Sequence, residues 1–359
     1  LKNNKEIIKT SNDLTDTQLG IPALNIVKYK DINATADVDF YYSNKKLNEV
    51  KIISYKQGND EMNGLVKLSK DFKPYKSLEL NLNRDTKKTS IKVIKNKNIN
   101  NLDLKGDYFD FSKTLKETFF EKQNEDSFLL QLQPLAINLK AKEILVAEEK
   151  SIYDVDAVLK YENKLFTNAK LHSKLHNEKT FDLSINSLES SRELIINSND
   201  AGLFLRTFNI NKSGKDGEFV LHGIYDDTKV THPLNSSVTI RDMRLIKAPT
   251  LAKILNLASI GIVSTLSGEG ILINKLKSEF VLESGVLNLK KYEAYGPDIG
   301  FSNQGKIYLR DDIIDLEGAM IPMVTLNKII GSIPVLGKIL TNERKGIWSF
   351  AYTITGNIE

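Results

Sequence analysis

Two histidines, His172 and His176, stand four residues apart within the segment 171–176. On a helix this spacing would place both imidazoles on one face and suggest a metal pair. The surrounding residues alternate as in a strand, so the two side chains would share a face about 13 Å apart, too far for one metal ion. No Glu completes a His-Glu-x-x-His motif, and we expect no metal site. His222 and His232 are isolated and are expected at surface or strand-end positions.

Four carboxylates, those of Asp311, Asp312, Asp315 and Glu317, are dense enough to suggest acid–base chemistry. Asp311 and Asp312 fit a hairpin turn, whereas Asp315 and Glu317 alternate with apolar residues after it. The carboxylate pair of a glycosidase needs a polar cleft rather than the regular wet face of a strand. We therefore expect these residues to be solvated and not catalytic.

The segment Gly268–Gly270 superficially resembles a phosphate-binding loop. It lacks the Gly-Lys-Ser/Thr ending of a P-loop and follows an expected helix instead of preceding one, so a turn between helix and strand is the better interpretation. The chain has no Gly-x-Ser-x-Gly elbow and no Cys, which excludes thiol nucleophiles, disulfides and thiolate metal sites. The sequence thus predicts a protein that is not an enzyme and uses no cofactor or metal.

Composition restricts the class of protein further. The 359 residues can bury a large core as one or two domains, and 41% hydrophobic with 27% charged residues is typical of a folded chain. The net charge of +4 is small, and Lys and Glu are interleaved without a basic block, so no nucleic acid partner is expected. No run approaches 18 uninterrupted apolar residues, and the first residues lack the apolar centre of a signal peptide.

Alternation of apolar and polar residues with a period of two dominates the chain, as in segments 77–83 and 180–186. This pattern places every second apolar side chain on one face of a sheet. No exact internal repeat is visible, which disfavours a propeller or a hexapeptide β-helix. The fold is therefore predicted to be mainly β, a long meander of antiparallel hairpins. Its expected turns include Asn63-Gly64, Ser284-Gly285 and Asp311-Asp312.

Three segments, 111–122, 249–266 and 326–340, carry the helical spacing of apolar residues. Ser112 is expected to cap the first helix, and Pro249 fits the first turn of the second. The third is too apolar for an isolated solvated helix and must pack on something. Its residues expected to contact a membrane or a partner are Ile329, Ile330, Ile333, Leu336, Ile339 and Leu340.

The alternating apolar residues of the C-terminal region have two interpretations. They could fill the core of a sandwich or line an open apolar groove, because both structures need the same alternation. The candidate groove residues are Phe219, Leu221, Val238, Ile240, Phe280, Leu282, Leu287, Leu289, Ile307, Leu309, Ile314 and Leu316.

Several short motifs follow one another from about residue 200 onward. Asp200-Ala-Gly precedes an expected strand with an arginine, and a glycine-bounded strand follows at 217–223. The later pieces are 239–249, 266–271, 295–297 and 333–340. In this order they resemble the C-terminal region of the AsmA-like family, the bacterial envelope proteins related to YhdP and TamB. Residues 1–199 resemble the family only in strand pattern and in the piece Phe109-Asp-Phe-Ser.

This resemblance implies a long, bent antiparallel sheet that forms an open groove, a β-taco or gutter, with a few short helices, two of them near the C-terminus. It implies non-catalytic binding and conveying of phospholipid acyl chains between the inner and outer membranes, as in bridge-like lipid transfer proteins. It also implies the periplasm as location. The chain would be the soluble portion of a bacterial protein anchored in the inner membrane by a helix absent from it, with a possible outer-membrane or envelope protein partner.

Two other functions stay open. The same strands could pair at their edges in a structural or assembly factor for outer-membrane biogenesis, and a glycan-active enzyme with a β fold is a further alternative. Two regions are expected. Residues 1–125 would form an N-terminal β segment of the groove that ends in a short helix. Residues 126–359 would form the AsmA-like β-groove region with the two apolar helical segments.

Overall fold

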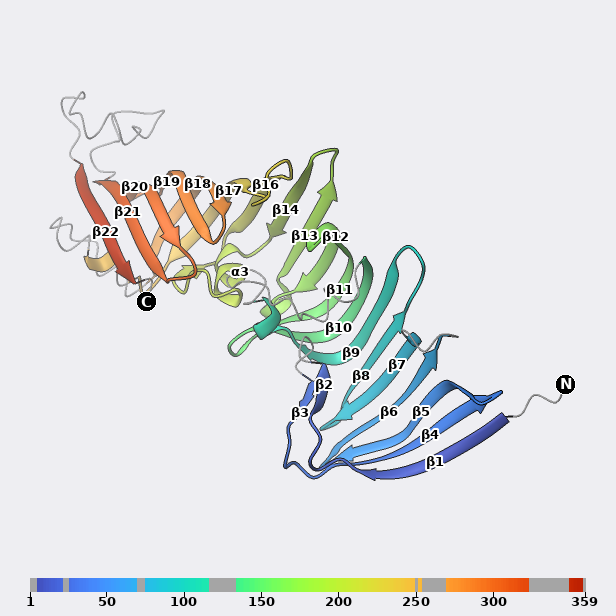
Figure 1. The fold of residues 1–359 in the computed structure, drawn as a ribbon. Coiled ribbons are helices and arrows are strands. Elements are labelled where there is room, and N and C mark those ends of the chain that lie inside the picture. Colours follow the sequence, from blue (N-terminus) through green and yellow to red (C-terminus); the bar gives the residue numbers. More distant parts are fainter. Residues whose placement is uncertain are drawn as a thin grey trace. The chain divides into compact units, whose positions relative to one another are not determined.

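The computed structural model describes residues 5–21, 26–69, 75–115, 134–248, 251–253, 269–322 and 349–357. Twenty strands form one large open sheet that is not closed into a barrel (Figure 1). The other sheet in these residues is the two-stranded pair of β2 and β3. The predicted fold class, mainly β on a large open sheet with few short helices, is confirmed.

The chain divides into two compact units, which we describe separately. Unit 1 comprises Leu1–Glu117 and Lys122–Ser173, and unit 2 comprises Thr118–Glu121 and Lys174–Glu359. The predicted boundary near residues 125–126 lies outside the described residues.

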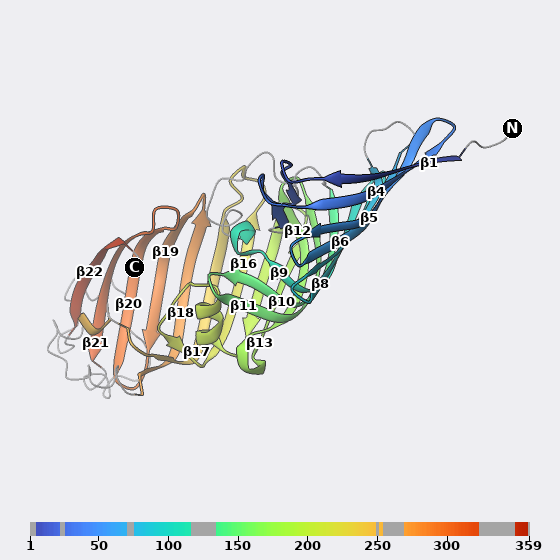
Figure 2. The same ribbon diagram turned by 90° about the horizontal axis from the view of Figure 1, so that it is seen from below.

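Unit 1 contains twelve strands. The side-by-side order of β4 to β9 is visible in Figure 1, and Figure 2 shows the same strands from below. Their bounds are β1 (Lys5–Asp13), β2 (Leu19–Ile21), β3 (Ile26–Lys28), β4 (Thr35–Ser43), β5 (Lys46–Gln57), β6 (Asp60–Leu68), β7 (Tyr75–Arg84), β8 (Lys87–Ile94), β9 (Asn100–Asp110), β10 (Leu135–Ala147), β11 (Lys150–Glu162) and β12 (Leu165–Lys174). β1 pairs with β4, and each strand from β4 to β8 pairs antiparallel with the next.

Hairpin turns in unit 1 explain the antiparallel order. Asn44 and Lys45 join β4 to β5, and Asp85 and Thr86 join β7 to β8, all four with positive φ as in a type I′ turn. The turn expected at Asn63-Gly64 is wrong, because both residues lie inside β6. A Cβ on Gly64 would come within 2.8 Å of the Glu79 carbonyl oxygen, so this glycine permits a close strand approach.

One pairing departs from the antiparallel meander. β9 and β10 pair in parallel, with Leu135 opposite Asn100 and Leu145 opposite Asp110. Parallel neighbours need a long connection, and residues 111–134 separate the two strands in the sequence. From β10 to β11 the pairing is antiparallel again.

Unit 2 continues as an antiparallel meander. Its elements are η2 (His176–Glu178), β13 (Thr180–Ser187), β14 (Ser191–Ser198), α3 (Ala201–Thr207), β15 (Gly214–Lys215), β16 (Glu218–Asp226), β17 (Leu234–Leu245), β18 (Ile271–Glu283), β19 (Val286–Tyr295), β20 (Ile299–Tyr308), β21 (Ile313–Pro322) and β22 (Phe350–Asn357). β13 pairs with β14, β14 with β16, and each strand from β16 to β22 with the next. The short β15 pairs with β17.

Helix α3 corrects the strand expected after Asp200. The Asp200 carboxylate accepts a hydrogen bond from the Leu203 backbone nitrogen at 2.8 Å, which caps the helix. Gly202 lets the helix lie against β15, because a Cβ there would be 2.3 Å from the Lys215 nitrogen. The local cap and this close approach favour a helix over the strand that the motif suggested.

The other expected helices are described only in part. Residues 112–115 and 251–253 are helical, and the remainder of segments 111–122 and 249–266, like all of 326–340, lies outside the described residues. Ser112 does not cap the first of these helices. The Asp110 carboxylate accepts from the Ser112 nitrogen and hydroxyl at 3.0 and 2.6 Å, because Asp110 precedes the first turn.

Candidate functional site

In unit 1 one face of the sheet is almost entirely apolar. Cross-strand partners lie on the same face, so the pairing register joins alternate residues into continuous rows. Three rows cross from β4 to β11, and we call them the unit 1 apolar face. They are Phe40, Val50, Val66, Leu78, Val93, Leu102, Ile137, Leu159; then Val38, Ile52, Gly64, Leu80, Ile91, Leu104, Leu139, Ala157; then Ala36, Tyr55, Met62, Leu82, Thr89, Gly106, Ala141, Val155.

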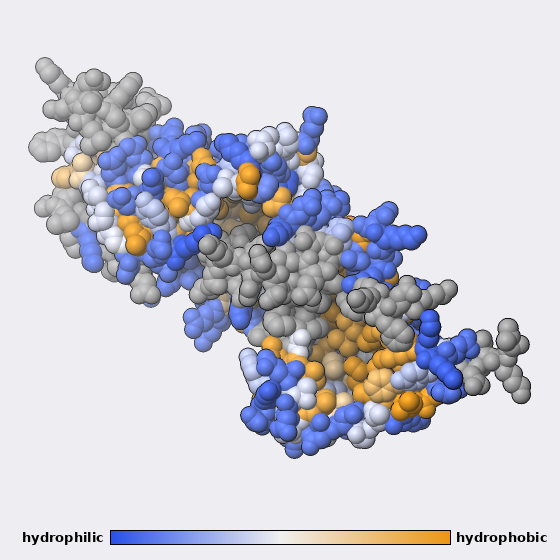
Figure 3. All heavy atoms as spheres, viewed as in Figure 1, coloured by the Kyte–Doolittle hydropathy of each residue, from blue (hydrophilic) through white to orange (hydrophobic). Residues whose placement is uncertain are grey.

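Burial varies along the unit 1 apolar face. Ile91 and Val93 are 0% exposed and Leu102 is 1% exposed, so water is excluded at β8 and β9. Phe40, Val50 and other side chains of β4 to β6 are only half-buried. Figure 3 shows hydrophobic residues gathered in a hollowed surface of this unit. The face is therefore reachable over β4 to β6.

The opposite face of unit 1 is polar. Lys140 and Asp156 form an ion pair at 2.6 Å, and Lys142 and Asp107 form another at 2.8 Å, all from alternating positions of neighbouring strands. The hydrogen bond from Lys142 is the main reason that the pKa of Asp107 lies below its usual value. One wet face and one apolar face are what the period-two alternation predicted.

Unit 2 presents an analogous face, with four rows from β14 to β22 that we call the unit 2 face. The rows are Arg192, Tyr225, Leu234, Leu282, Leu287, Ile307, Ile314, Gly356; then Leu194, Gly223, Ser236, Phe280, Leu289, Gly305, Leu316, Ile354; then Ile196, Leu221, Val238, Ser278, Tyr292, Asn303, Gly318, Tyr352; then Ser198, Phe219, Ile240, Leu276, Ala294, Phe301, Met320, Phe350.

The candidate groove residues lie together on this face. All of them except Leu309 are members of the four rows. Leu309 follows β20, and its nitrogen donates to the Gly285 carbonyl at 2.9 Å. Leu289 and Leu316 are buried, at 7% exposure each, whereas Leu282, Leu287, Ile307 and Ile314 near the hairpin ends are half-buried. Binding of lipid by these residues stays a prediction.

Phe219 differs from the other candidates because an aromatic cluster lies against it. Its ring lies 4.8 Å from that of Phe204 on α3, and Phe204 in turn contacts Phe181 and Phe208 at 5.5 and 5.0 Å between ring centroids. At 4% exposure Phe219 is covered by this aromatic cluster. The helix was expected to be a strand, so its contact with Phe219 was not foreseen, and binding of lipid by Phe219 stays a prediction.

A polar row crosses the unit 2 face and was missed from the sequence. Ser278, Tyr292, Asn303, Gly318 and Tyr352 are successive partners in the third row from β18 to β22. The Tyr352 hydroxyl donates to Asn303 Oδ1 at 2.8 Å. A Cβ on Gly318 would lie 2.3 Å from the same oxygen, so the glycine makes room for the bond. Burial raises the pKa of Tyr292 to about 12.

A β-bulge explains why simple alternation does not place Tyr292 on the same face as Leu289. The register of β19 with β20 shifts between Leu289 and Tyr292, so these residues face the same side although their spacing is odd. The available signal was the pair Lys290-Lys291, which interrupts the alternation of the strand.

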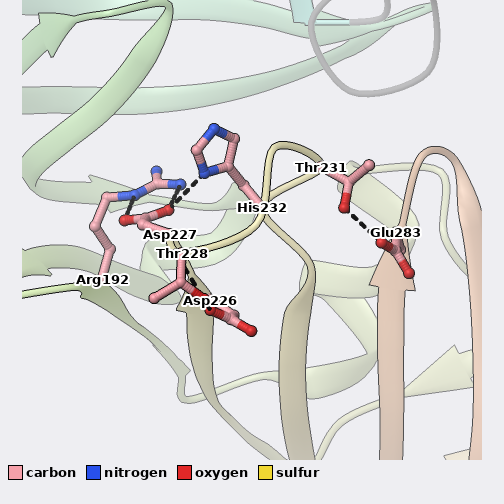
Figure 4. A network of polar contacts seen from close by, with 7 residues as sticks. All are labelled: Arg192, Asp226, Asp227, Thr228, Thr231, His232 and Glu283. Carbon is pink, nitrogen blue, oxygen red and sulfur yellow. Dashed lines mark hydrogen bonds and ion pairs between the residues drawn. The ribbon is translucent and has the colours of Figure 1, made fainter.

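A buried ion pair closes the first row of the unit 2 face (Figure 4). Arg192, 5% exposed, donates to both carboxylate oxygens of Asp227 at 2.8 and 2.9 Å, and its guanidinium lies 4.3 Å from the Tyr225 ring centroid. His232 Nδ1 lies 2.9 Å from Asp227 Oδ1. Burial by itself would raise the pKa of Asp227, but the hydrogen bonds and charge of Arg192 outweigh it and leave the pKa lowered. The arrangement fixes the loop between β16 and β17.

The histidines and carboxylates that were considered for metal binding or acid–base chemistry do not lie together in one site among the described residues. His172 lies in β12 and His176 in η2, and in the described part of the chain no group of His, Asp and Glu is arranged to hold a metal ion. His222 contacts Glu193 at 2.9 Å on the polar side of β16. Asp315 and Glu317 are exposed on β21, on the side opposite Leu316.

Known proteins offer no direct guide to this face. Comparison of the chain with protein-family models, curated proteins and solved structures gives no match. Over the residues that the structure describes, no helix combines the length and the apolar character needed to cross a bilayer. The predicted membrane or partner helix, with Ile329, Ile330, Ile333, Leu336, Ile339 and Leu340, lies outside those residues.

Proposed function

We propose that this chain binds the acyl chains of phospholipids along the apolar faces of its open sheet and conveys them without chemistry. The observation that carries the proposal is the unit 1 apolar face, where three rows of apolar partners cross from β4 to β11 without a charged residue. Those eight strands, spaced by about 4.8 Å, give a face about 34 Å long, whose side chains keep part of their surface exposed over β4 to β6.

The energetic requirement suits such a face. Each methylene removed from water is worth about 0.8 kcal/mol, so a sixteen-carbon chain needs about 12 kcal/mol of shielding along its path. A row of apolar side chains that continues from strand to strand supplies shielding at each point. No directed polar contact is needed to hold a hydrocarbon, which agrees with the composition of the face.

The alternative of a filled sandwich has less support. Within the described residues the large sheet is accompanied by the β2–β3 pair and by no second large sheet. The apolar side chains of β4 to β6 keep part of their surface exposed, although a packed sandwich would bury them between two layers. Space for a ligand is therefore best sought over β4 to β6.

The cellular setting belongs to the same proposal. The AsmA-like resemblance supports a periplasmic location, an inner-membrane anchor outside this chain and an envelope protein partner. An amphipathic sheet with one apolar face would suit lipid passage through the aqueous space between two membranes.

Site-specific photocrosslinking tests the proposal on two neighbouring residues. A photoreactive amino acid at Val50, on the unit 1 apolar face, should crosslink to phospholipid in cells and in vesicle suspensions. The same group at Lys51, the next residue on β5, is exposed on the opposite face and serves as the matched control. Equal labelling at both positions, or no phospholipid in native mass spectra of the gently purified chain, would overturn the proposal.

A further inference from the structure

The unit 2 face contains a polar row between apolar ones. On one side of Ser278, Tyr292, Asn303 and Tyr352 lies the row with Phe280, Leu289 and Leu316, and on the other lies the row with Leu276, Ala294 and Phe301. The unit 1 apolar face has no counterpart, since Tyr55 and Thr89 supply its hydroxyl groups at separate strands. The polar row is thus particular to unit 2.

The row is built to present neutral hydrogen-bonding groups. Asn303 Oδ1 accepts from the Tyr352 hydroxyl at 2.8 Å, which orients the amide and leaves its nitrogen as a donor. No hydrogen bond of the Tyr292 hydroxyl is seen among the described residues, and burial alone raises the pKa of this group. Tyr292, Asn303 and Tyr352 are half-buried as whole residues, and none of their polar atoms is among the fully buried ones that lack a hydrogen-bond partner in the described part of the chain.

The chemistry of the row selects a class of ligand. It contains hydroxyl and amide groups and no Lys or Arg, so it suits neutral acceptors better than phosphate, for which Arg or Lys is the usual partner. The apolar rows on both sides require that the polar group of the ligand be flanked by hydrocarbon. Ester carbonyls between an acyl chain and glycerol have both properties.

We propose that Tyr292 and Asn303, with Ser278 and Tyr352 beside them, form a hydrogen-bonding subsite for the ester carbonyls of a diacyl glycerolipid. The inference rests on the proposed acyl-chain binding and deepens it. The ester region would lie over β19 to β22, and the acyl chains would follow the neighbouring apolar rows. Unit 2 would then bind a lipid with its ester groups at one fixed position, whereas unit 1 would bind an acyl chain at any position along the face.

A competition between two matched lipids tests the subsite. The full chain is incubated with vesicles holding equal amounts of ester-linked diacyl and ether-linked dialkyl phosphatidylcholine of the same chain length. The ratio of bound lipids is then read by native mass spectrometry. The ether lipid lacks the carbonyl acceptors. Because a net hydrogen bond contributes about 0.5–1.5 kcal/mol, we expect the ester lipid to be favoured about two- to tenfold.

Two conservative variants separate the subsite from a structural role. Tyr292→Phe should bring the ester-to-ether ratio toward one while total bound lipid is kept. Tyr295→Phe, on the same strand with its side chain on the opposite face, is the matched control and should leave the ratio unchanged. A melting curve of each variant by circular dichroism establishes that it is folded.

The outcomes distinguish the two proposals. Binding of neither lipid by the wild-type chain would overturn acyl-chain binding and the subsite together. Binding of both lipids at a ratio of one, or a ratio that Tyr292→Phe does not change, would overturn the subsite alone. A preference for the ester lipid that Tyr292→Phe removes and Tyr295→Phe preserves is the result expected.

Discussion

The two units build the same kind of face from different side chains. In unit 1 the rows from β4 to β11 contain no charged residue, their hydroxyl groups are those of Tyr55 and Thr89 on separate strands, and the ion pairs lie on the opposite side. In unit 2 the rows include the buried Arg192 and the polar side chains of Tyr292 and Asn303. They also include Phe219, which packs against Phe204 of α3. Alternation of apolar and polar residues therefore produces an amphipathic sheet in both units. The side chains on its apolar side decide whether a unit offers only hydrophobic contact or also hydrogen bonds to a polar part of a ligand.

The largest expected effect concerns the ion pairs of the two units. Arg192→Met removes the bidentate partner of the partly buried Asp227 carboxylate and leaves it with His232 alone, and we expect a loss of about 3–5 kcal/mol in the free energy of unfolding. Lys140→Met breaks an ion pair of unit 1 whose side chains are 63% and 56% exposed, and it should cost about 0–1 kcal/mol. Urea unfolding followed by circular dichroism measures both. Equal losses in the free energy of unfolding would contradict the view that the Arg192–Asp227 pair stabilises the fold more than the exposed Lys140–Asp156 pair.

A second prediction concerns burial along the unit 1 apolar face. Ile91→Ala removes methyl groups from a site that is 0% exposed and should cost about 2–5 kcal/mol. Val50→Ala, on the same face at a half-buried position, should cost clearly less, because water already reaches the side chain. Denaturant titration of the two variants compares them. A larger loss at Val50 would contradict an accessible face over β4 to β6.

The third prediction uses pH to sharpen the contrast at Tyr292. The folded chain holds the phenolic proton more tightly, with a pKa of about 12 against the usual 10.0, so stability is complete below pH 10. It should fall by up to about 2 kcal/mol as the pH rises from 10 to 12. Urea titrations of the wild type and of Tyr292→Phe at pH 8 and pH 11.5 give the difference due to this group. An identical fall in both proteins would count against a buried hydroxyl there.

The smallest effect of a single side-chain change is expected for Tyr352, whose hydrogen bond joins β22 to β20 across Gly318. Tyr352→Phe removes the bond to Asn303 and should cost about 1 kcal/mol. Gly318→Ala should break the same bond by steric conflict and cost about 1–3 kcal/mol. Once the bond is lost, the two losses should not add in the double variant. Simple additivity in thermal or urea unfolding would show that the glycine and the bond are independent.

Part of the candidate site could be predicted from the sequence because strand alternation is local. Leu282, Leu287, Ile307 and Ile314 were assigned to one face by parity alone, and the pairing register places them in one row. Tyr292 could not be assigned in this way, because a bulge changes the parity of its strand. Nor could α3, whose position depends on a close contact between Gly202 and β15.

The amino-acid sequence by itself determined a mainly β chain with one apolar and one polar side to its strands, since the direction of each side chain follows from a period of two. Only the tertiary structure decided which strands are neighbours. The parallel pairing of β9 with β10 depends on contacts such as that of Asn100 with Leu135, and the bulge before Tyr292 depends on the register of β19 with both of its neighbouring strands. Those contacts place hydroxyl groups in one row and apolar groups in the next, and no local pattern encodes such an arrangement.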